Sequence, residues 1–467
     1  MNWIKVLWVD DEIEMLKPHF LFLKERGYET TPCTNGQDAL DLIKATSFDI
    51  VLLDENMPGL NGLETLDEIK NILPDLPVIM ITKNEEEHIM EEAIGAKISD
   101  YLIKPVNPNQ ILLSLKKILN HKSLIADKTT QNYQQQFREI SQSLMNLETH
   151  QDWSDYFKKL MYWELELESL EDSSMFQVFE TQMKEANIQF AKFIENHYEH
   201  WMRGNPGPVF SHQAFEKFVF PQIKQHQPTL LLMIDNLRFD QWKTILPELK
   251  NYCKVIQEET YYSLLPTATQ YARNAFFAGY TPLEISKRFP QWWKNDIDEG
   301  GKNLYELELL KEQCQRLGME RPMSYHKITQ LQQSQQLIKN LQNHTHEGLT
   351  TVVYNFVDMI SHAKTEMEVI KELAPDSKAY RSITSSWFKN SPLKELIKKA
   401  CDLNYTILFT TDHGTIHVGY PSEVIGDKET SINLRYKSGK SLTFDPKDVI
   451  QCKNPQEYQL PSFYGIN

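Results

Sequence analysis

Short apolar runs, several of which end at acidic residues, recur along this chain and restrict what it can fold into. Five of them alternate with amphipathic helical patterns near the N-terminus: Ile4–Val9, Tyr28–Pro32, Asp49–Leu53, Pro77–Thr82 and Asp100–Ile103. Five β–α units of this kind predict a parallel sheet with helices on both faces. Later apolar runs predict a second α/β sheet, with strands at Thr229–Ile234, Thr350–Phe356 and Tyr405–Thr410.

The stretch between these two regions has a helical pattern. Strand signals are absent from residues 123–203, and helices are expected near 127–147 and 152–168. A third helix is expected along the apolar stripe of Phe176, Phe179, Met183, Ala186, Phe190, Phe193 and Ile194. The turn-rich segment Gly204-Asn205-Pro206-Gly207-Pro208 ends the pattern. Three domains are therefore expected, over residues 1–122, 123–208 and 209–467.

Composition and charge exclude some classes of protein. The 467 residues carry a formal net charge of −15, which argues against general affinity for nucleic acids or membrane surfaces. Five cysteines without a CxxC pair favour free thiols in a reducing compartment. No signal peptide and no apolar run of membrane-spanning length is found. We therefore expect a soluble cytoplasmic protein without membrane insertion.

Residues of matching chemistry end or follow the strands of the first region. Asp10 and Asp11 follow the first strand, Asp54 follows the third, Thr82 ends the fourth and Lys104 follows the fifth. In a doubly wound sheet these positions meet at one edge. The acids offer hard oxygen ligands for Mg²⁺, and Asp54 can then accept a phosphoryl group whose oxygens contact Lys104 and Thr82. An acidic pair after a strand is often only a solvated loop, but here five residues are in register.

This first region resembles the receiver domain of bacterial response regulators, a flavodoxin-like fold. The resemblance rests on Asp54-Glu55-Asn56-Met57-Pro58-Gly59 and on the stretch from Gly95-Ala96 through Asp100-Tyr101-Leu102-Ile103-Lys104-Pro105. It implies phosphorylation at Asp54 by a sensor histidine kinase. It also places Tyr101 where receivers carry a switch aromatic, although edge packing explains that residue equally well.

The second α/β region carries a set of acids and histidines. Asp235 directly follows a strand, a position at which aspartate also commonly caps a helix. Asp358 and His362 are four residues apart, so a helix places them on one face, although a solvated polar pair has the same spacing. Asp412-His413-Gly414 follows a strand directly, and glycine allows close backbone approach to a ligand. Mixed Asp and His ligands favour Zn²⁺ or Mn²⁺ over Mg²⁺.

A two-metal phosphoester site also needs a nucleophile. A hydroxyl at the start of a helix suits this role, because backbone N–H groups there also hold phosphate. Pro266-Thr267-Ala268-Thr269, followed by an apolar helical run to Gly279, supplies such a hydroxyl.

The order of these residues resembles the alkaline phosphatase superfamily, whose phosphodiesterase members place a threonine nucleophile in a Pro-x-x-Thr context with a glycine ten residues on. This implies an α/β sandwich with two Zn²⁺ ions, Thr269 rather than Thr267 as nucleophile, and Thr269 as a further ligand beside Asp235, Asp412 and His413. The context Ile234-Asp235-Asn236-Leu237-Arg238-Phe239-Asp240 is similar to the PglZ branch.

A receiver, a helical bundle and a PglZ-type domain in this order resemble PorX-type response regulators, which are linked to type IX secretion. The resemblance implies a zinc-dependent phosphodiesterase that acts on short linear or cyclic oligonucleotides. It also implies activation by phosphorylation of Asp54, homodimerisation, and secretion-machinery or sigma-factor partners.

One departure from the superfamily concerns a further histidine near the C-terminus, which would complete the site of Asp358 and His362. His417, only four residues past His413, lies too close to be that ligand. We therefore expect the second zinc site to be incomplete and the C-terminal domain to be C-terminally incomplete.

Weaker candidates have simpler alternatives. Arg238 and Asn274 are possible substrate contacts, with a salt bridge and helix packing as the alternatives. Residues 279–350 are expected to be mostly helical and to cap a substrate cleft. A basic cluster that is able to hold an oligonucleotide, or else forms a solvated hairpin, comprises Lys428, Arg435, Lys437 and Lys440.

Two other functions are alternatives to the phosphodiesterase. One is a non-enzymatic signalling protein with a degenerate metal domain that acts through partner binding, which the incomplete second site supports. The other is a transcription factor, which the acidic charge and the absence of a helix-turn-helix pattern make a weak hypothesis. Sequence-specific DNA binding is therefore not expected.

Overall fold

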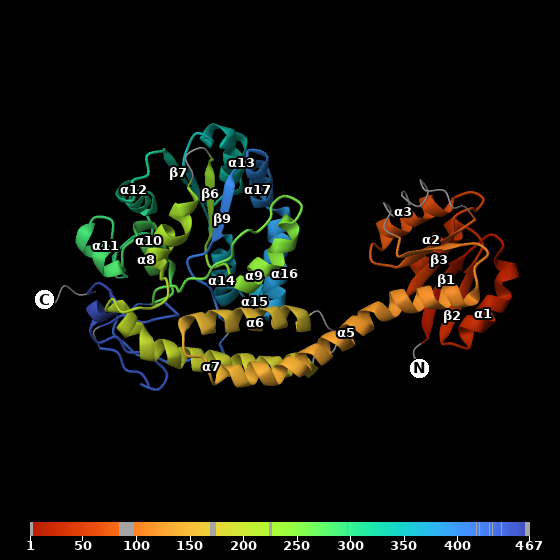
Figure 1. Ribbon diagram of the computed structural model, residues 1–467, viewed down its shortest axis with the longest axis horizontal. Helices are drawn as coiled ribbons and strands as arrows, with labels where there is room; N and C mark the ends of the chain where they lie inside the picture. Colours follow the sequence, from red (N-terminus) through yellow and green to blue (C-terminus); the bar gives the residue numbers. More distant parts are fainter. Residues whose placement is uncertain are drawn as a thin grey trace. The chain divides into compact units, whose positions relative to one another are not determined.

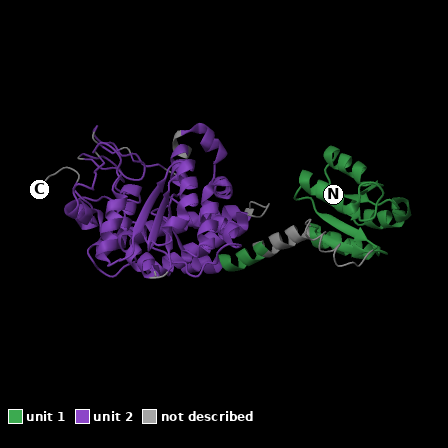
Figure 2. Ribbon diagram, turned by 90° about the horizontal axis from the view of Figure 1, so that it is seen from above, with its two compact units in different colours: residues 1–137 green, residues 138–467 purple. Residues whose placement is uncertain are grey.

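The computed structural model describes residues 3–83, 98–168, 174–223, 227–296 and 298–462, apart from residues 417, 420, 429, 432 and 440. The chain divides into two compact units, residues 1–137 and 138–467 (Figure 2). Each unit contains a parallel sheet, which confirms the expected pair of α/β regions. The three predicted domain boundaries stay predictions.

Unit 1 is built on a five-stranded parallel sheet of order β2-β1-β3-β4-β5 (Figure 1). The strands are β1 (Ile4–Val9), β2 (Tyr28–Cys33), β3 (Ile50–Asp54), β4 (Val78–Thr82) and β5 (Asp100–Ile103). The described helices are α1 (Lys17–Lys24), α2 (Gly36–Ala45), α3 (Gly62–Ile72) and the first part of α5 (Pro108–Leu144). Alternate residues of β1 enter two separate apolar clusters, so both faces of the sheet are covered. This is the flavodoxin-like order that the sequence predicts.

Helix α5 is longer than the sequence interpretation expects. It runs through 37 residues, from Pro108 to Leu144, and includes most of the helix expected near 127–147. Neither glycine nor proline occurs between residues 109 and 203, so no residue of the usual helix-breaking type interrupts α5.

Two further helices confirm the helical linker. These are α6 (His150–Glu168) and α7 (Ser174–Met202), and both belong to unit 2. The ring of Trp153 in α6 lies 5.2 Å from Phe190 and 5.7 Å from Phe193 of α7, centroid to centroid. The predicted aromatic stripe therefore packs one helix against the other.

Unit 2 contains a four-stranded parallel sheet of order β7-β8-β6-β9. The strands are β6 (Thr229–Ile234), β7 (Met323–Ile328), β8 (Leu349–Tyr354) and β9 (Thr406–Thr410). The expectation of a mostly helical stretch over residues 279–350 was wrong at β7. This strand pairs only with β8 and is half-buried, so its sequence contains Ser324, His326 and Lys327 instead of an apolar run.

The longer helices of unit 2 lie on both faces of this sheet (Figure 1). They are α8 (Ser211–Ala214), α9 (Phe239–Ile245), α10 (Thr269–Ala278), α11 (Pro282–Arg288), α12 (Glu306–Arg316), α13 (Leu331–Asn340), α14 (Phe356–Glu366), α15 (Glu368–Leu373), α16 (Ser377–Asn390) and α17 (Pro392–Asp402). Short helical turns are η1 (Ile13–Leu16), η2 (Phe215–Val219), η3 (Phe220–Gln222), η4 (Leu246–Leu249), η5 (Leu341–His344) and η6 (Pro455–Tyr458).

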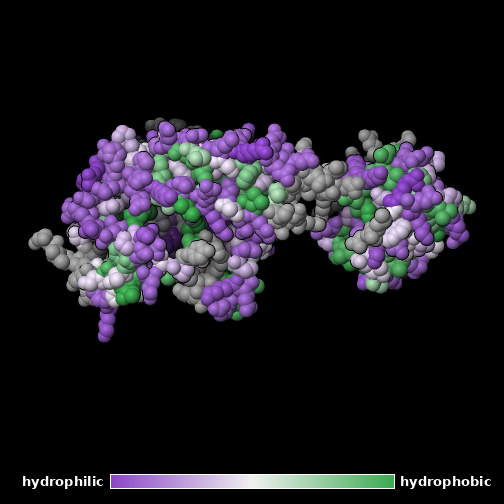
Figure 3. Space-filling model, turned by 90° about the horizontal axis from the view of Figure 1, so that it is seen from below, coloured by the Kyte–Doolittle hydropathy of each residue, from purple (hydrophilic) through white to green (hydrophobic). Residues whose placement is uncertain are grey.

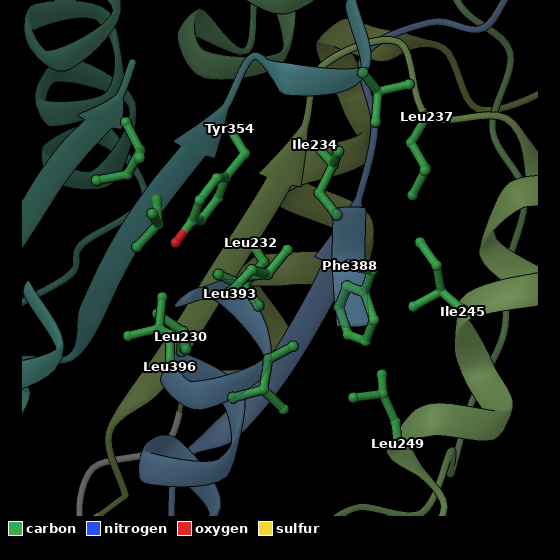
Figure 4. Packing of buried hydrophobic residues seen from close by; sticks show 14 of the residues in the cluster. Leu230, Leu232, Ile234, Leu237, Ile245, Leu249, Tyr354, Phe388, Leu393 and Leu396 are labelled. Carbon is green, nitrogen blue, oxygen red and sulfur yellow. The ribbon is translucent and has the colours of Figure 1, made fainter. Parts of the chain in front are cut away.

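Strand β6 lies at the centre of the unit 2 core and is buried along its whole length. Leu230, Leu232 and Ile234 face a cluster that contains residues of α9, α16 and α17 (Figure 4). Leu231 and Met233 face the opposite cluster, with residues of α8, α10 and α12. A parallel strand that is covered on both faces has a continuous apolar sequence. This is why β6 could be predicted from the sequence.

The mostly polar surface and the free cysteines are as the composition predicts. Polar residues cover most of the face shown in Figure 3, with smaller apolar patches between them. Among the described residues, the search for a helix of bilayer-spanning length and hydrophobicity finds none. All five cysteines are free thiols.

Candidate functional site

The carboxyl end of the unit 1 sheet brings acidic residues and a lysine together. Asp10 follows β1 and Asp54 ends β3; both are buried, whereas Asp11 is exposed. The Lys104 Nζ lies 2.8 Å from Asp10 Oδ2 and 3.0 Å from Asp54 Oδ1. Burial raises the pKa of the Asp54 carboxyl above its usual value, although Lys104 acts in the opposite direction.

This cluster fits a magnesium ion. Ligand oxygens of Asp10, Asp11 and Asp54 all lie within 4.8 Å of one another. An all-oxygen set is what Mg²⁺ prefers, and one lysine among three carboxylates leaves a net negative charge for it to offset. The structure thus brings together four of the five residues predicted for the phosphoryl site.

Thr82 and Tyr101 contact residues other than the three clustered aspartates and Lys104. Thr82 ends β4, is fully buried, and its hydroxyl donates a hydrogen bond to the carboxylate of Glu55, the residue after Asp54. Tyr101 in β5 is half-buried and packs against an apolar cluster of unit 1. Their roles in phosphate contact and switching stay predictions. Gly95 and Ala96 lie outside the described residues.

In unit 2, a turn after β6 fixes the first predicted metal ligand, Asp235. The next residue, Asn236, has a φ of 63° in the left-handed region, which asparagine tolerates better than most residues. Its backbone N–H donates to Asp412 Oδ1 at 3.2 Å, and its side-chain Nδ2 donates to Asp358 Oδ1 at 3.1 Å. Asn236 therefore connects three predicted ligands at this turn: Asp235, which precedes it, and Asp412 and Asp358, to which it donates hydrogen bonds.

Asp412 and His413 follow β9 and are both buried. Asp412 Oδ1 also accepts the backbone N–H of His413 at 3.0 Å. His413 Nε2 lies 3.7 Å from Asp235 Oδ1 and 3.8 Å from Asp412 Oδ2. The three predicted ligands from two neighbouring strands thus point at one another.

Thr269 is the first residue of α10 and remains partly exposed. Its Oγ1 lies 3.1 Å from His413 Nε2 and 3.4 Å from Asp235 Oδ1. The first N–H groups of a helix have no partner within the helix and favour anions. The helix ends at Gly279, whose φ of 65° is left-handed, which accounts for a glycine at that position. The predicted nucleophile therefore lies beside the predicted ligands.

Asp235, Asp412 and His413 fit a divalent cation. Their ligand atoms lie within 4.8 Å of one another. Asp412 Oδ2 is buried without a hydrogen-bond partner, and the nearest guanidinium nitrogen, Arg273 Nη1, lies 3.8 Å away, so this oxygen is free to coordinate a cation. Burial lowers the pKa of His413 to about 4, so the ring is neutral at pH 7 as a metal ligand must be. Burial, with Asp412 nearby, raises the pKa of Asp235 to about 6.

Arg273 and Glu306 are absent from the sequence interpretation but belong to this site. Both are buried, and Arg273 Nη1 lies 2.5 Å from Asp235 Oδ2 while its Nε lies 2.5 Å from Glu306 Oε1. Lys327 Nζ lies 2.9 Å from Glu306 Oε2. Arg273 lies one helical turn after Thr269 in an otherwise mostly apolar helix. This spacing is the sequence feature that could have predicted Arg273 as a site residue.

Asp358 and His362 form a less complete pair on α14. His362 Nε2 lies 3.4 Å from Asp358 Oδ2, but the His362 side chain is 70% exposed against 18% for Asp358. Burial, with Asp235 nearby, raises the pKa of Asp358. Within the described part of the chain, no third His, Cys, Asp or Glu joins these two in a ligand group.

The two weaker substrate candidates have structural partners. Arg238 pairs with Asp240, which was the simpler alternative, and Asp240 also contacts Arg381. Asn274 is buried; its Nδ2 donates to the Lys302 carbonyl at 3.1 Å, and its Oδ1 accepts from Asn303 Nδ2 at 3.0 Å. The geometry favours a salt bridge for Arg238 and packing for Asn274, and their substrate contacts stay predictions.

The residues of the predicted basic cluster differ in their exposure and their contacts. Lys428 is exposed and Lys437 is partly exposed, whereas Lys440 and His417 lie outside the described residues. Arg435 differs, because its Nη1 lies 3.1 Å from His413 Nδ1 and donates to the Gly414 carbonyl at 2.8 Å.

A cavity of about 1300 Å³ reaches the metal ligands from the side of α6 and α7. Aromatic and apolar side chains dominate its lining, including Phe157, Phe190, Phe239, Trp242 and Tyr261. Asp412, His413 and Gly414 also line it. The cavity therefore adjoins Asp412 and His413, whereas Asp235 and Thr269 do not line it.

Three family descriptions match the chain in succession. Residues 6–116 match the response regulator receiver domain, and residues 123–202 match the PorX response regulator linker domain. Residues 214–459, more than half of the chain, match the BREX system PglZ alkaline phosphatase-like domain. All the predicted metal ligands and Thr269 fall within this third match.

Curated relatives match the N-terminal part. The transcriptional regulatory protein ZraR of Klebsiella oxytoca is 33% identical over 140 residues, 30% of this chain and 32% of that protein. The transcriptional regulatory protein ResD of Bacillus subtilis is 31% identical over 122 residues, 26% of this chain and 50% of that protein. The chain thus spans about a third to a half of the length of these relatives.

Solved structures match the same part. The receiver domain of NtrX from Brucella abortus is 32% identical, with a TM-score of 0.24, and covers 25% of this chain and 98% of its own. The chemotaxis protein CheY4 of Vibrio cholerae is 28% identical, with a TM-score of 0.24, and covers 25% of this chain and 99% of its own.

Proposed function

This chain belongs to the PglZ alkaline phosphatase-like family and carries its domains in the order of a PorX-type response regulator, and we propose that it is a phosphorylation-controlled, metal-dependent phosphodiesterase. The observation that carries the proposal is the convergence of Thr269 on Asp235 and His413, at 3.4 and 3.1 Å. A hydroxyl at a helix start beside a buried Asp–Asp–His set suits attack on phosphorus.

In the proposed reaction, Thr269 Oγ1 attacks the phosphorus of a phosphodiester. An Oγ–P bond forms, the bond from phosphorus to one ester oxygen breaks, and the departing oxygen takes a proton from water. The Thr269 proton passes to solvent. Water then attacks the same phosphorus, breaks the Oγ–P bond and restores the threonine hydroxyl.

Asp235, Asp412, His413 and Thr269 would hold a divalent cation, which we propose is zinc. Such an ion lowers the pKa of a bound hydroxyl and offsets charge on the reacting oxygens. The Asp358–His362 pair, with two ligands and an exposed histidine, would hold a second cation more weakly. Arg273 keeps Asp235 oriented and offsets part of the charge of the acid pair.

The substrate class that we propose is a short linear or cyclic oligonucleotide. The support is the cavity beside Asp412 and His413, because its aromatic lining offers faces for base stacking. A phosphodiester with bases on either side would place its phosphate at Thr269 and a base among these rings.

Control of the activity is proposed to begin in unit 1. A sensor histidine kinase would supply the phosphoryl group to Asp54, with Mg²⁺ at Asp10, Asp11 and Asp54. Phosphorylation would favour a homodimer, and the regulated process would be type IX secretion, through secretion-machinery or sigma-factor partners. The match to the PorX linker domain supports this assignment.

Hydrolysis of bis(p-nitrophenyl) phosphate by the purified full-length chain tests the proposal. We expect turnover with Zn²⁺ or Mn²⁺, none after chelation, and loss of turnover in Thr269→Ala. Thr267→Ala is the matched control, because it removes a hydroxyl two residues away that has no hydrogen bond among the described residues. Turnover that is equal in wild type and Thr269→Ala would reject the mechanism. A folded, zinc-binding chain that hydrolyses no diester, including a dinucleotide, would favour the non-enzymatic signalling role.

A further inference from the structure

We propose that Arg435 is a catalytic residue of this site, whose guanidinium donates hydrogen bonds to the non-bridging oxygens of the phosphodiester that Thr269 attacks. This inference rests on the proposed function and adds a transition-state contact to it. Arg435 lies in sequence far from the ligands and outside any helix or strand, and only the fold brings it to the site.

The partners of the Arg435 guanidinium surround the nucleophile. Its Nη1 donates to the Thr267 carbonyl, two residues before Thr269, and to the Gly414 carbonyl at 2.8 Å, one residue after the ligand His413. Nη1 also lies 3.1 Å from His413 Nδ1, while Nε2 of the same ring lies 3.1 Å from Thr269 Oγ1. Arg435 and Thr269 therefore approach the two nitrogens of one imidazole.

The guanidinium keeps donors for a ligand. A guanidinium has five N–H groups, of which Nη1 uses two on the carbonyls. One Nη2 hydrogen is directed at Asn236 Oδ1, at 3.5 Å. The Nε–H and the other Nη2–H have no partner within the described part of the chain, and the residue is exposed. Two unused donors on one guanidinium can bind oxygens of a phosphate.

The segment that carries Arg435 is fastened to the nucleophile helix. Tyr436 donates its hydroxyl to Asp296 Oδ1 at 2.8 Å, and Ser438 donates to Asp296 Oδ2 at 3.0 Å. Tyr271, two residues after Thr269 in α10, also donates to Asp296 Oδ2, at 3.3 Å. The shared carboxylate fixes Arg435 relative to α10, as a preorganised transition-state contact requires.

Two other arginines lie near the ligands, and both are engaged by acidic residues. Arg238 pairs with Asp240. Arg273 is buried, and its guanidinium is already engaged by Asp235 and Glu306. Arg435 is thus the arginine beside His413 that combines fixed position with unused donors, among the residues that the structure describes. The phosphate of the substrate is the anion that the unused donors of Arg435 would contact.

The test compares Arg435→Ala, Arg435→Lys and the matched control Lys447→Ala, which removes an exposed cation from the same irregular C-terminal stretch. With zinc-loaded protein and bis(p-nitrophenyl) phosphate, Arg435→Ala should lower kcat by about 100-fold, the scale of one lost transition-state donor. Arg435→Lys should recover only part of the loss, and Lys447→Ala should stay within about twofold of wild type. Zinc content and the thermal midpoint should match wild type, which separates this role from a structural one.

Binding of inorganic phosphate to the same zinc-loaded proteins, measured by calorimetry, is the second measurement. Arg435→Ala should bind phosphate at least about tenfold more weakly. Equal turnover and equal phosphate affinity in wild type and Arg435→Ala would overturn the inference, as would loss of zinc in that variant. If wild type turns over no faster than Thr269→Ala, the proposed function fails. The inference itself is then overturned if Arg435→Ala leaves phosphate affinity unchanged.

Discussion

The acidic cluster of unit 1 and that of unit 2 share a position but differ in their surroundings. Both lie at the carboxyl ends of parallel strands. In unit 1 the exposed Asp11 opens the cluster to solvent, and Lys104 bridges Asp10 and Asp54. In unit 2, Asp235 and Asp412 are each only 1% exposed, and a buried arginine contacts Asp235.

The difference indicates two kinds of phosphate chemistry. An open carboxylate cluster would let a small metal ion and a phosphoryl donor exchange, with Asp54 as the proposed ligand and acceptor. A buried set with a neutral histidine and a separate hydroxyl is fixed in advance, as catalysis requires. The first site therefore suits a reversible signal, and the second suits repeated turnover.

The largest effect is expected from Asp54→Ala. Removing the acceptor carboxylate should abolish phosphorylation and, with it, phosphate-driven dimerisation. Light scattering with and without beryllofluoride measures this, with Asp41→Ala, an exposed residue of α2, as the control. Equal mass of the wild type in every condition would refute dimerisation as the output.

Asp412→Asn should reduce kcat/KM by roughly 10³-fold, the scale of losing a member of a catalytic set that acts as a unit. The amide keeps the shape of the side chain but loses the charge on Oδ2, the buried oxygen without a hydrogen-bond partner. Zinc content by atomic absorption should fall in parallel. Asp402→Asn, at an exposed helix end, is the control, and a variant that kept its zinc would contradict the ligand assignment.

Arg273→Ala should destabilise unit 2 by roughly 3–5 kcal/mol, because it leaves the Asp235 carboxylate buried without its arginine and leaves Glu306 with Lys327 as its remaining cation. Urea unfolding of the metal-free protein measures the change in free energy of unfolding. Zinc should restore part of the lost free energy of unfolding, because its charge offsets that of the Asp235 carboxylate. A change below about 1 kcal/mol would show that water reaches these acids.

Zinc affinity should depend on pH with a slope set by one proton. Burial raises the pKa of Asp235 to about 6 and lowers that of His413 to about 4. Between pH 4 and pH 6, therefore, Asp235 is protonated and must lose its proton to bind zinc, while His413 is already neutral. Affinity should fall about tenfold per pH unit below pH 6 and level off above it. Titration against a competing chelator measures this, and a slope of two would mean that a second ligand, such as Asp412, whose pKa burial also raises, titrates in the same range.

The smallest effect is expected from His362→Ala. The side chain is 70% exposed and, among the described residues, pairs with Asp358 alone, so the variant should lose less than about fivefold in kcat/KM. The comparison with Asp412→Asn separates a weakly held second cation from the main one. Equal losses in the two variants would show that His362 is a full metal ligand.

Strand-end residues were the part of both sites that the sequence could predict. Asp10, Asp54, Asp235 and Asp412 follow or end apolar runs, and parallel strands bring such positions to one edge. Thr269 was predictable because Pro266 and Gly279 match the spacing of the phosphodiesterases that the chain resembles.

Residues that act through long-range contacts could not be predicted in the same way. Glu306 reaches Arg273 from 33 positions along the chain, so no local spacing joins them. Arg435 looked like one member of a solvated basic cluster, and only the fold places it beside His413. Strand β7 escaped prediction because a half-buried edge strand carries polar residues that resemble a loop or helix.

The central claim is that Thr269 is the nucleophile. Acid-quenched samples taken during turnover of bis(p-nitrophenyl) phosphate, digested and examined by mass spectrometry, test it most directly. The account predicts a p-nitrophenyl phosphoryl group on the peptide that contains Thr269, and none in Thr269→Ala. Turnover with that peptide unmodified, or with the group on another residue, would contradict it.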